Sequence, residues 1–115
     1  MADAVYVNEE EGKKRVMNNG KLYAKLLGKV KDSAGPNMEE LETSANAQNW
    51  EKAQTAAHTI KGIAANLSLT ELYNQSIDVE AQIKGGSLKA ESLENLKVCF
   101  GETLSEVEKV IAKYA

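Results

Sequence analysis

The stretch that most constrains the fold runs from residue 49 to residue 67, where apolar residues recur at helical spacing in the sequence NWEKAQTAAHTIKGIAANL. At about 100° per residue, a helix over this range gathers its apolar side chains on one side. These side chains are Ala53, Ala56, Ala57, Ile60, Ala64 and Leu67. Such a stripe is typical of a helix that packs into a bundle. The spacing therefore predicts one amphipathic helix against which the other helical segments pack.

His58, the only histidine of the chain, lies off this stripe. It falls about 150° from the centre of the stripe, so we expect its side chain to point into solvent. Lys61 and Gly62 follow three and four residues later on the same surface, and Ala65 lies one turn further on. A glycine inside a helix costs about 1 kcal/mol relative to alanine. Gly62 therefore indicates either a close helix crossing or a bare patch that lets a large partner reach His58, and its distance from the apolar stripe weighs against the first.

The segments before this helix contain capping and breaking signals. Asn8, followed by three glutamates, predicts the start of a short helix that runs to about Met17. A second helix is expected from about residue 21 to 31, and the only proline, Pro36, should end it. Asn37 should begin a third helix, with Glu40 completing a capping box. The three glutamates at 9–11 are interpreted as a charged first turn rather than as a metal site.

The segments after it contain similar signals. The sequence Ser68-Leu69-Thr70-Glu71 predicts a capping box that opens a helix to about residue 84, and a long last helix follows Ser87. Glu80 falls close to the apolar stripe of the first of these two helices. It is interpreted as an edge residue whose charge reaches water, because a buried carboxylate would need a partner that the sequence does not identify. Cys99 is expected to be buried as a small hydrophobic side chain.

Composition limits the class of protein. The 115 residues carry a net charge of −3 without a basic patch, which argues against nucleic acid as a partner. No apolar run approaches the roughly 20 residues of a membrane span, no signal peptide is recognisable, and a single cysteine excludes an intrachain disulfide. We expect one cytoplasmic domain over residues 1–115 that acts as a monomer. Its fold class should be all-α, an antiparallel up-and-down four-helix bundle with one or two short additional N-terminal helices. The four long helices should be those around Leu26, His58, Tyr73 and Phe100.

One motif resembles a known family. Residues 57–62, AHTIKG, followed by AANL at 64–67, are similar to the signature of the histidine-containing phosphotransfer (HPt) domain. The resemblance extends to Asn49-Trp50-Glu51 at the start of the helix, to Leu22-Tyr23 with Leu26-Leu27, and to Val79-Glu80. It therefore covers most of the chain. The sequence departs from the family pattern at Ser68, where glycine is usual, and at Ile63, where alanine or serine is preferred.

The resemblance implies a function for the exposed histidine. His58 would accept a phosphoryl group on Nε2 from an aspartate of a receiver domain and pass it to another receiver, with Lys61 stabilising the phosphoryl oxygens. Gln54, Gly62 and Ala65 would form the receiver-docking surface. The partners would be the receiver domains of a hybrid sensor histidine kinase and of a response regulator. The chain would need no cofactor of its own, since the receiver would supply Mg²⁺.

Two other classes of function compete with this one. A helical adaptor would bind receiver-like partners without being phosphorylated, but an intact His58 argues against it. A small hydrolase would need a nucleophile, a base and an orienting group in a cleft, and no second catalytic group can be identified. A metal site would need several ligands, whereas the chain has one histidine and one cysteine that is expected to be buried. The chain is therefore predicted to be a phosphoryl carrier rather than an enzyme.

Overall fold

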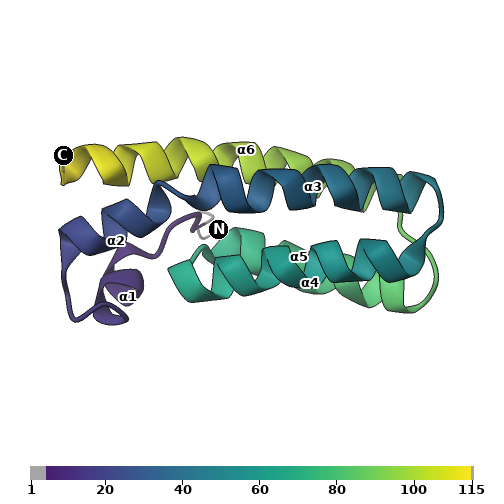
Figure 1. Cartoon of the computed structure of the whole chain (residues 1–115), viewed down its shortest axis with the longest axis horizontal. Coiled ribbons are helices and arrows are strands. Elements are labelled where there is room, and N and C mark those ends of the chain that lie inside the picture. The colour runs from purple at the N-terminus through teal and green to yellow at the C-terminus, as the bar shows by residue number, and fades with distance from the viewer. Residues whose placement is uncertain (1–4, 115) are drawn as a thin grey trace.

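The computed structural model describes residues 5–114 and is all-helical, as predicted; no strand occurs within this range (Figure 1). Six helices follow one another along the chain. They are α1 (Glu9–Lys14), α2 (Gly20–Leu27), α3 (Val30–Asn46), α4 (Trp50–Leu67), α5 (Thr70–Lys84) and α6 (Ala90–Lys113).

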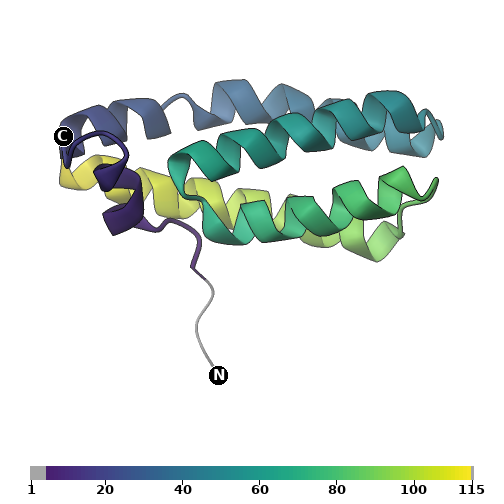
Figure 2. The same ribbon diagram turned by 90° about the horizontal axis from the view of Figure 1, so that it is seen from below.

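The four longest helices, α3 to α6, lie side by side along the long axis of the molecule. Short connections reverse the chain between successive members of this set, and α2 continues the line of α3 beside the last turns of α6 (Figure 1). The view from below shows α4 and α5 next to each other on one side of the molecule (Figure 2). Residues of α4 and α5, which are joined by a very short turn, therefore share one face of the molecule.

The core confirms the predicted phase of α4. Ala53, Ala56, Ala57, Ile60 and Ala64 are buried, whereas Leu67 is only partly buried. Small alanine side chains let neighbouring helices approach closely, so α4 packs tightly between α3 and α5. Cys99 in α6 is buried, as expected, and burial raises the pKa of its thiol to about 11.

The boundary predicted at Pro36 is wrong, because α3 runs through this residue without interruption. Proline removes one backbone donor, and the carbonyl that loses its partner belongs to Asp32. Asp32 and Pro36 are both exposed, so water can hydrogen-bond to this carbonyl. Gly35, which has no side chain to collide with the proline ring, allows the helical backbone before it. Asn37 therefore lies inside α3, where its Nδ2 donates to the Ser33 carbonyl at 2.8 Å, and it caps no helix.

The break lies instead at residues 28–29, between α2 and α3. The helix around Leu26 is consequently short, and α3 takes its expected place among the four long helices. Leu22 in α2 is 40% exposed, and Tyr23, Ala24 and Leu27 form the buried side of this helix. The helix start predicted at Asn8 is confirmed, since its side chain accepts a hydrogen bond from a backbone N–H in the first turn of α1, and Asn49 caps α4 in the same way.

The predicted capping box at Ser68 is also wrong. Ser68 ends α4 in the left-handed conformation (φ 58°, ψ 42°), and its Oγ donates to Glu11 Oε1 at 2.8 Å. Its backbone carbonyl accepts a hydrogen bond from the Asn8 N–H at 2.9 Å, and the Glu71 N–H donates to the Val5 carbonyl at 2.9 Å. The left-handed backbone explains why glycine would suit this position. The N-terminal segment thus holds the corner between α4 and α5.

Candidate functional site

The imidazole of His58 stands on the outer surface of α4, with 68% of its side chain exposed. Asn49 fixes the start of this helix, and the buried residues Ala57 and Ile60 fix its rotation about its own axis. Because these two positions face the core, the side chain of His58 must leave the helix toward solvent. The prediction that His58 is exposed is therefore confirmed.

Glu80 on α5 lies directly beside it and corrects the sequence interpretation. Its side chain is only 5% exposed, so it is not an edge residue with its charge in water. One carboxylate oxygen, Oε1, accepts a hydrogen bond from Lys61 Nζ at 2.7 Å, and the other, Oε2, lies 3.2 Å from His58 Nδ1. The partners of the buried carboxylate are therefore the two residues that the sequence motif had already singled out.

The charge state of Glu80 follows from these contacts. Burial by itself raises the pKa of the Glu80 carboxyl, but the hydrogen bond and positive charge of Lys61 outweigh it, and His58 adds to the lowering. The pKa of Glu80 is thus held below its ordinary value of 4.5, and the group is an anion at neutral pH. A carboxylate only accepts hydrogen bonds, so in a neutral imidazole the proton must be on Nδ1. The lone pair is then on Nε2.

A hollow of about 470 Å³ opens beside His58 between α4 and α5. Its lining residues are Glu51, Gln54, Thr55, His58, Thr59, Glu80 and Lys84. Gln54, predicted as a docking residue, is therefore part of the wall next to the imidazole. Lys84 was missed by the sequence interpretation, although a signal existed, since it follows Glu80 by one helical turn on α5.

Gly62 and Ala65 lie on the other side of His58 along α4. Gly62 is exposed, and a Cβ atom built on it meets no atom within 4 Å, so the interpretation of Gly62 as a packing glycine is wrong. Ala65 is partly buried and lines a second hollow of about 400 Å³, together with Arg15, Ser68 and other residues. The structure thus brings Gln54, Gly62 and Ala65 onto the same side of α4 as His58.

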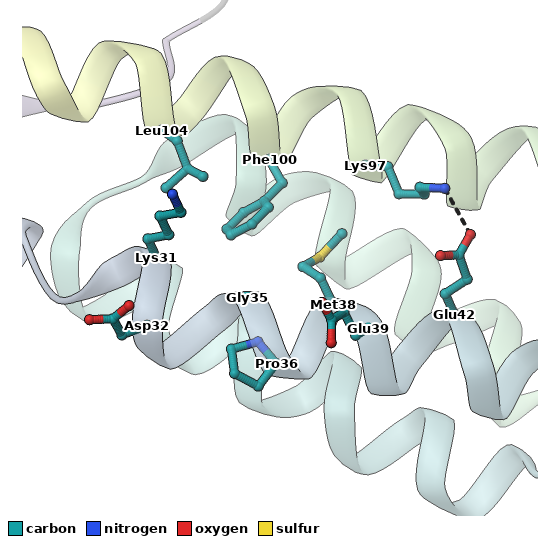
Figure 3. Close-up of a pocket in the computed structure, with 10 residues that line it drawn as sticks. All are labelled: Lys31, Asp32, Gly35, Pro36, Met38, Glu39, Glu42, Lys97, Phe100 and Leu104. Carbon is teal, nitrogen blue, oxygen red and sulfur yellow. Dashed lines mark hydrogen bonds and ion pairs between the residues drawn. The ribbon is translucent and has the colours of Figure 1, made fainter.

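A further hollow of about 500 Å³ lies between α3 and α6 and shares no residue with the surroundings of His58. Phe100 from α6 faces Met38 of α3 across it, Leu104 lies opposite Lys31, and the ion pair between Lys97 and Glu42 lies at one end (Figure 3). The positive charge of Lys97 is stabilised there, since Glu42 raises its pKa. This groove contains no histidine, cysteine or serine that would act as a nucleophile.

Within residues 5–114, no three His, Cys, Asp or Glu side chains are clustered so that they would hold a metal ion. None of the helices in the described part of the chain has the length and apolar character needed to cross a membrane.

Comparison with protein families places the chain in a known class. The family model described as "Hpt domain" matches residues 25–111, a range that includes His58, Lys61 and Glu80. Searches among curated proteins and among solved structures returned no match. Domains of the matched family carry out phosphotransfer in two-component signalling and interact with receiver domains. Because the matched range covers most of the 115 residues, the chain belongs to the Hpt domain family.

Proposed function

We propose that this protein is a phosphorelay intermediate that accepts a phosphoryl group on His58 from a receiver aspartate and passes it to the aspartate of another receiver. One observation carries the proposal: the exposed imidazole is held at Nδ1 by a buried carboxylate, Glu80, which leaves Nε2 free at the surface. An imidazole in this tautomer is a ready nucleophile near neutral pH.

The transfer step follows from this geometry. The lone pair of His58 Nε2 forms a bond to phosphorus, while the bond between phosphorus and the aspartyl oxygen breaks and the aspartate carboxylate keeps the electron pair. The ring gains positive charge because Nδ1 still carries its proton. The Glu80 carboxylate lies 3.2 Å from that nitrogen and stabilises the developing charge. The return step to a second aspartate reverses these bond changes.

Lys61 and the receiver supply the remaining electrostatic stabilisation. Lys61 neutralises Glu80 through the 2.7 Å hydrogen bond and adds positive charge near the oxygens of the transferred group. Gln54, Gly62 and Ala65 form the docking surface, since the receiver must approach closely enough to present its aspartate to Nε2. Mg²⁺ belongs to the receiver in this scheme, where it would neutralise the phosphoryl oxygens, and the chain needs no cofactor of its own.

The partners proposed on this basis are the receiver domains of a hybrid sensor histidine kinase and of a response regulator. The chain would act in the cytoplasm as a monomeric carrier, a single Hpt domain built as an up-and-down antiparallel four-helix bundle, without kinase or hydrolase activity. Support for a carrier comes from the site itself, since the exposed imidazole of His58 contacts the buried carboxylate of Glu80, which is paired with Lys61.

The test is incubation of the full chain with a receiver domain phosphorylated on its aspartate. We expect transfer to give one phosphate that is labile in acid and stable in base, and its position should be His58 by mass spectrometry. His58→Gln should fold equally well and accept no phosphate. If the variant is labelled as efficiently as the parent, the proposal is wrong; binding of the receiver without any transfer would instead indicate a non-phosphorylated adaptor.

A further inference from the structure

The second hollow on the His58 side of α4, of about 400 Å³, has one wall that comes from the N-terminal part of the chain. Its lining residues are Glu11, Arg15, Ala64, Ala65, Ser68, Thr70, Tyr73 and Asn74. The first two belong to α1 and the residue directly after it, and the others belong to α4, α5 and the turn between them. The family match begins at residue 25, so α1 lies outside the matched range. The wall formed by Glu11 and Arg15 is therefore a feature of this chain that the family match does not assign.

Contacts with α2 and with the corner between α4 and α5 fix the position of α1. Glu11 Oε1 accepts a hydrogen bond from Ser68 Oγ at 2.8 Å. Gly12 is buried against the ring of Tyr23, where a Cβ atom would collide with the ring. Arg15 directly follows α1, and its backbone N–H donates to the Glu11 carbonyl. The place of Arg15 beside α4 is therefore set by packed and hydrogen-bonded neighbours.

The charge of Arg15, the only arginine of the chain, is weakly paired. Its Nη2 lies 3.9 Å from Glu11 Oε1, which is too long for a hydrogen bond, and that oxygen already accepts from Ser68 Oγ. The side chain of Arg15 is 52% exposed. A guanidinium group has five N–H donors and matches the two oxygens of a carboxylate. Arg15 can therefore bind a carboxylate of another molecule while giving up only a long ion pair and contacts with water.

The hollow lies within reach of a partner that is centred on His58. Ala65, which lines it, follows His58 by seven residues, so it lies on the same side of α4 about 10 Å further along the helix. Even a weak protein–protein interface of about 600 Å² on each partner corresponds to a patch roughly 28 Å across. A receiver that presents its aspartate to His58 therefore also covers the hollow and approaches Arg15.

We propose that this hollow is a second contact site for the receiver, and that Arg15 selects receivers that carry an aspartate or glutamate side chain opposite it. The inference rests on the proposed function, since a receiver must dock at His58. Arg15 touches no reacting atom; it determines which receiver docks productively. A charge at the rim of an interface acts mainly on the association rate and its salt dependence. A receiver with a lysine at the same place would meet a like charge and be disfavoured.

Transfer rates from two donors of different size test this inference. The large donor is the phosphorylated receiver domain that transfers fastest to the parent chain among a panel of receivers. The small donor is phosphoramidate, with which His58 Nε2 forms the bond to phosphorus while the P–N bond breaks and ammonia leaves with its electron pair. The variants are Arg15→Gln and Arg15→Glu. Lys14→Gln is the matched control, because it removes an exposed positive charge from α1 that does not line the hollow.

We expect Arg15→Gln to lower the second-order rate constant for transfer from the receiver about 3- to 10-fold at low salt, and by less at about 0.5 M salt, because salt screens the interaction. Arg15→Glu should lower it further, and a lysine in place of one acidic residue of the receiver should restore transfer to Arg15→Glu. Lys14→Gln should stay close to the parent. Labelling by phosphoramidate should be the same in every one of these chains, since the small donor does not reach Arg15.

Equal rates from the receiver in Arg15→Gln and Lys14→Gln would overturn the inference, since any effect would then be one of net charge. Slower labelling of Arg15→Gln by phosphoramidate would also overturn it, as would an Arg15→Glu chain that no lysine substitution in the receiver rescues. A parent chain that takes no phosphate on His58 from any receiver would refute the proposed function and this inference with it. A labelled parent with unaltered transfer to Arg15→Gln refutes this inference alone.

Discussion

The exposed imidazole of His58 and the buried carboxylate of Glu80 are joined across two helices by a 3.2 Å contact between Nδ1 and Oε2. The orientation of a surface side chain is thus set by a group that solvent hardly reaches. An exposed side chain can usually adopt several orientations. The contact with Glu80 holds the His58 ring in one of them, so Nε2 points in a fixed direction. The cost of burying the carboxylate is offset by Lys61, whose hydrogen bond of 2.7 Å occupies the other oxygen.

Replacement of Glu80 should change both reactivity and the pH dependence of stability. Glu80→Gln keeps an oxygen for Nδ1 but loses the charge, so we expect phosphoryl acceptance to slow about 3- to 10-fold. The folded-state pKa of Glu80 is lowered, so its stabilising contribution is present above its ordinary pKa of 4.5 and is lost as pH falls through the folded-state value. The parent should therefore exceed Glu80→Gln in free energy of unfolding by about 1 kcal/mol at pH 7 and by less at pH 3.

Urea denaturation at both pH values measures this difference. Glu108→Gln, which removes an exposed carboxylate from α6, serves as the control and should show little difference from the parent at either pH. A Glu80→Gln variant that is as stable as the parent at pH 7 would show that the contact with Lys61 contributes nothing to the fold.

Lys61 should act through Glu80. Lys61→Ala removes the group that lowers the Glu80 pKa most, so we expect a loss of about 1–2 kcal/mol in the free energy of unfolding at pH 7. The same change in a Glu80→Gln background should cost less, which gives a coupling energy of about 0.5 kcal/mol or more in a double-mutant cycle. Lys61→Ala should still accept phosphate, but more slowly. Strictly additive effects of the two substitutions would contradict the pairing.

Gly62 should matter for the receiver and not for the fold. Gly62→Gln places a long side chain one turn from His58 in open space, so the free energy of unfolding should stay equal or rise by up to about 1 kcal/mol. Transfer from a receiver should be nearly abolished, whereas labelling by phosphoramidate should continue, because only the large donor is blocked.

Gly101 provides the matched control for this prediction. It also lies inside a helix with nothing within 4 Å of a Cβ built on it, but it belongs to α6. Gly101→Gln should give a similar change in thermal stability and leave transfer from the receiver intact. Equal inhibition by the two variants would place the docking surface elsewhere.

Pro36→Ala should stabilise the protein. Alanine restores a backbone N–H that can bond to the Asp32 carbonyl inside α3, and helical alanine is favoured over proline by about 3 kcal/mol in isolated helices. The helix here already accommodates the ring, and proline also restricts the unfolded chain, so we expect a net gain of about 0.5–2 kcal/mol in urea denaturation. A loss of stability would mean that the exposed ring makes contacts that the helix needs.

The sequence was sufficient wherever a local pattern decided the outcome. The helix around His58, its buried alanines and its exposed histidine all follow from one periodicity and were predicted correctly. The helix boundary at Pro36 was predicted wrongly. Proline usually ends a helix, but here the Asp32 carbonyl that loses its hydrogen bond can bond to water instead.

The two partners of Glu80 could not be predicted from the sequence, for a different reason. Its contacts with His58 and Lys61 span 22 and 19 residues, and they depend on how far α5 is shifted along α4. No periodicity within a single helix contains that shift. Lys84 follows Glu80 by one turn of α5, so its place beside the hollow could be inferred from the sequence only once the position of Glu80 was known.

The contacts of the N-terminal segment impose an order on folding. Glu11 and Asn8 bond to Ser68, some 60 residues later, and Glu9 bonds to Lys113 Nζ at 2.7 Å and to Tyr114 Oη at 2.6 Å. During synthesis, this segment therefore emerges long before either of its binding places exists. The hairpin of α4 and α5, with the histidine site between them, is built from contacts between neighbouring helices, so the segment at residues 8–11 can dock onto it only afterwards.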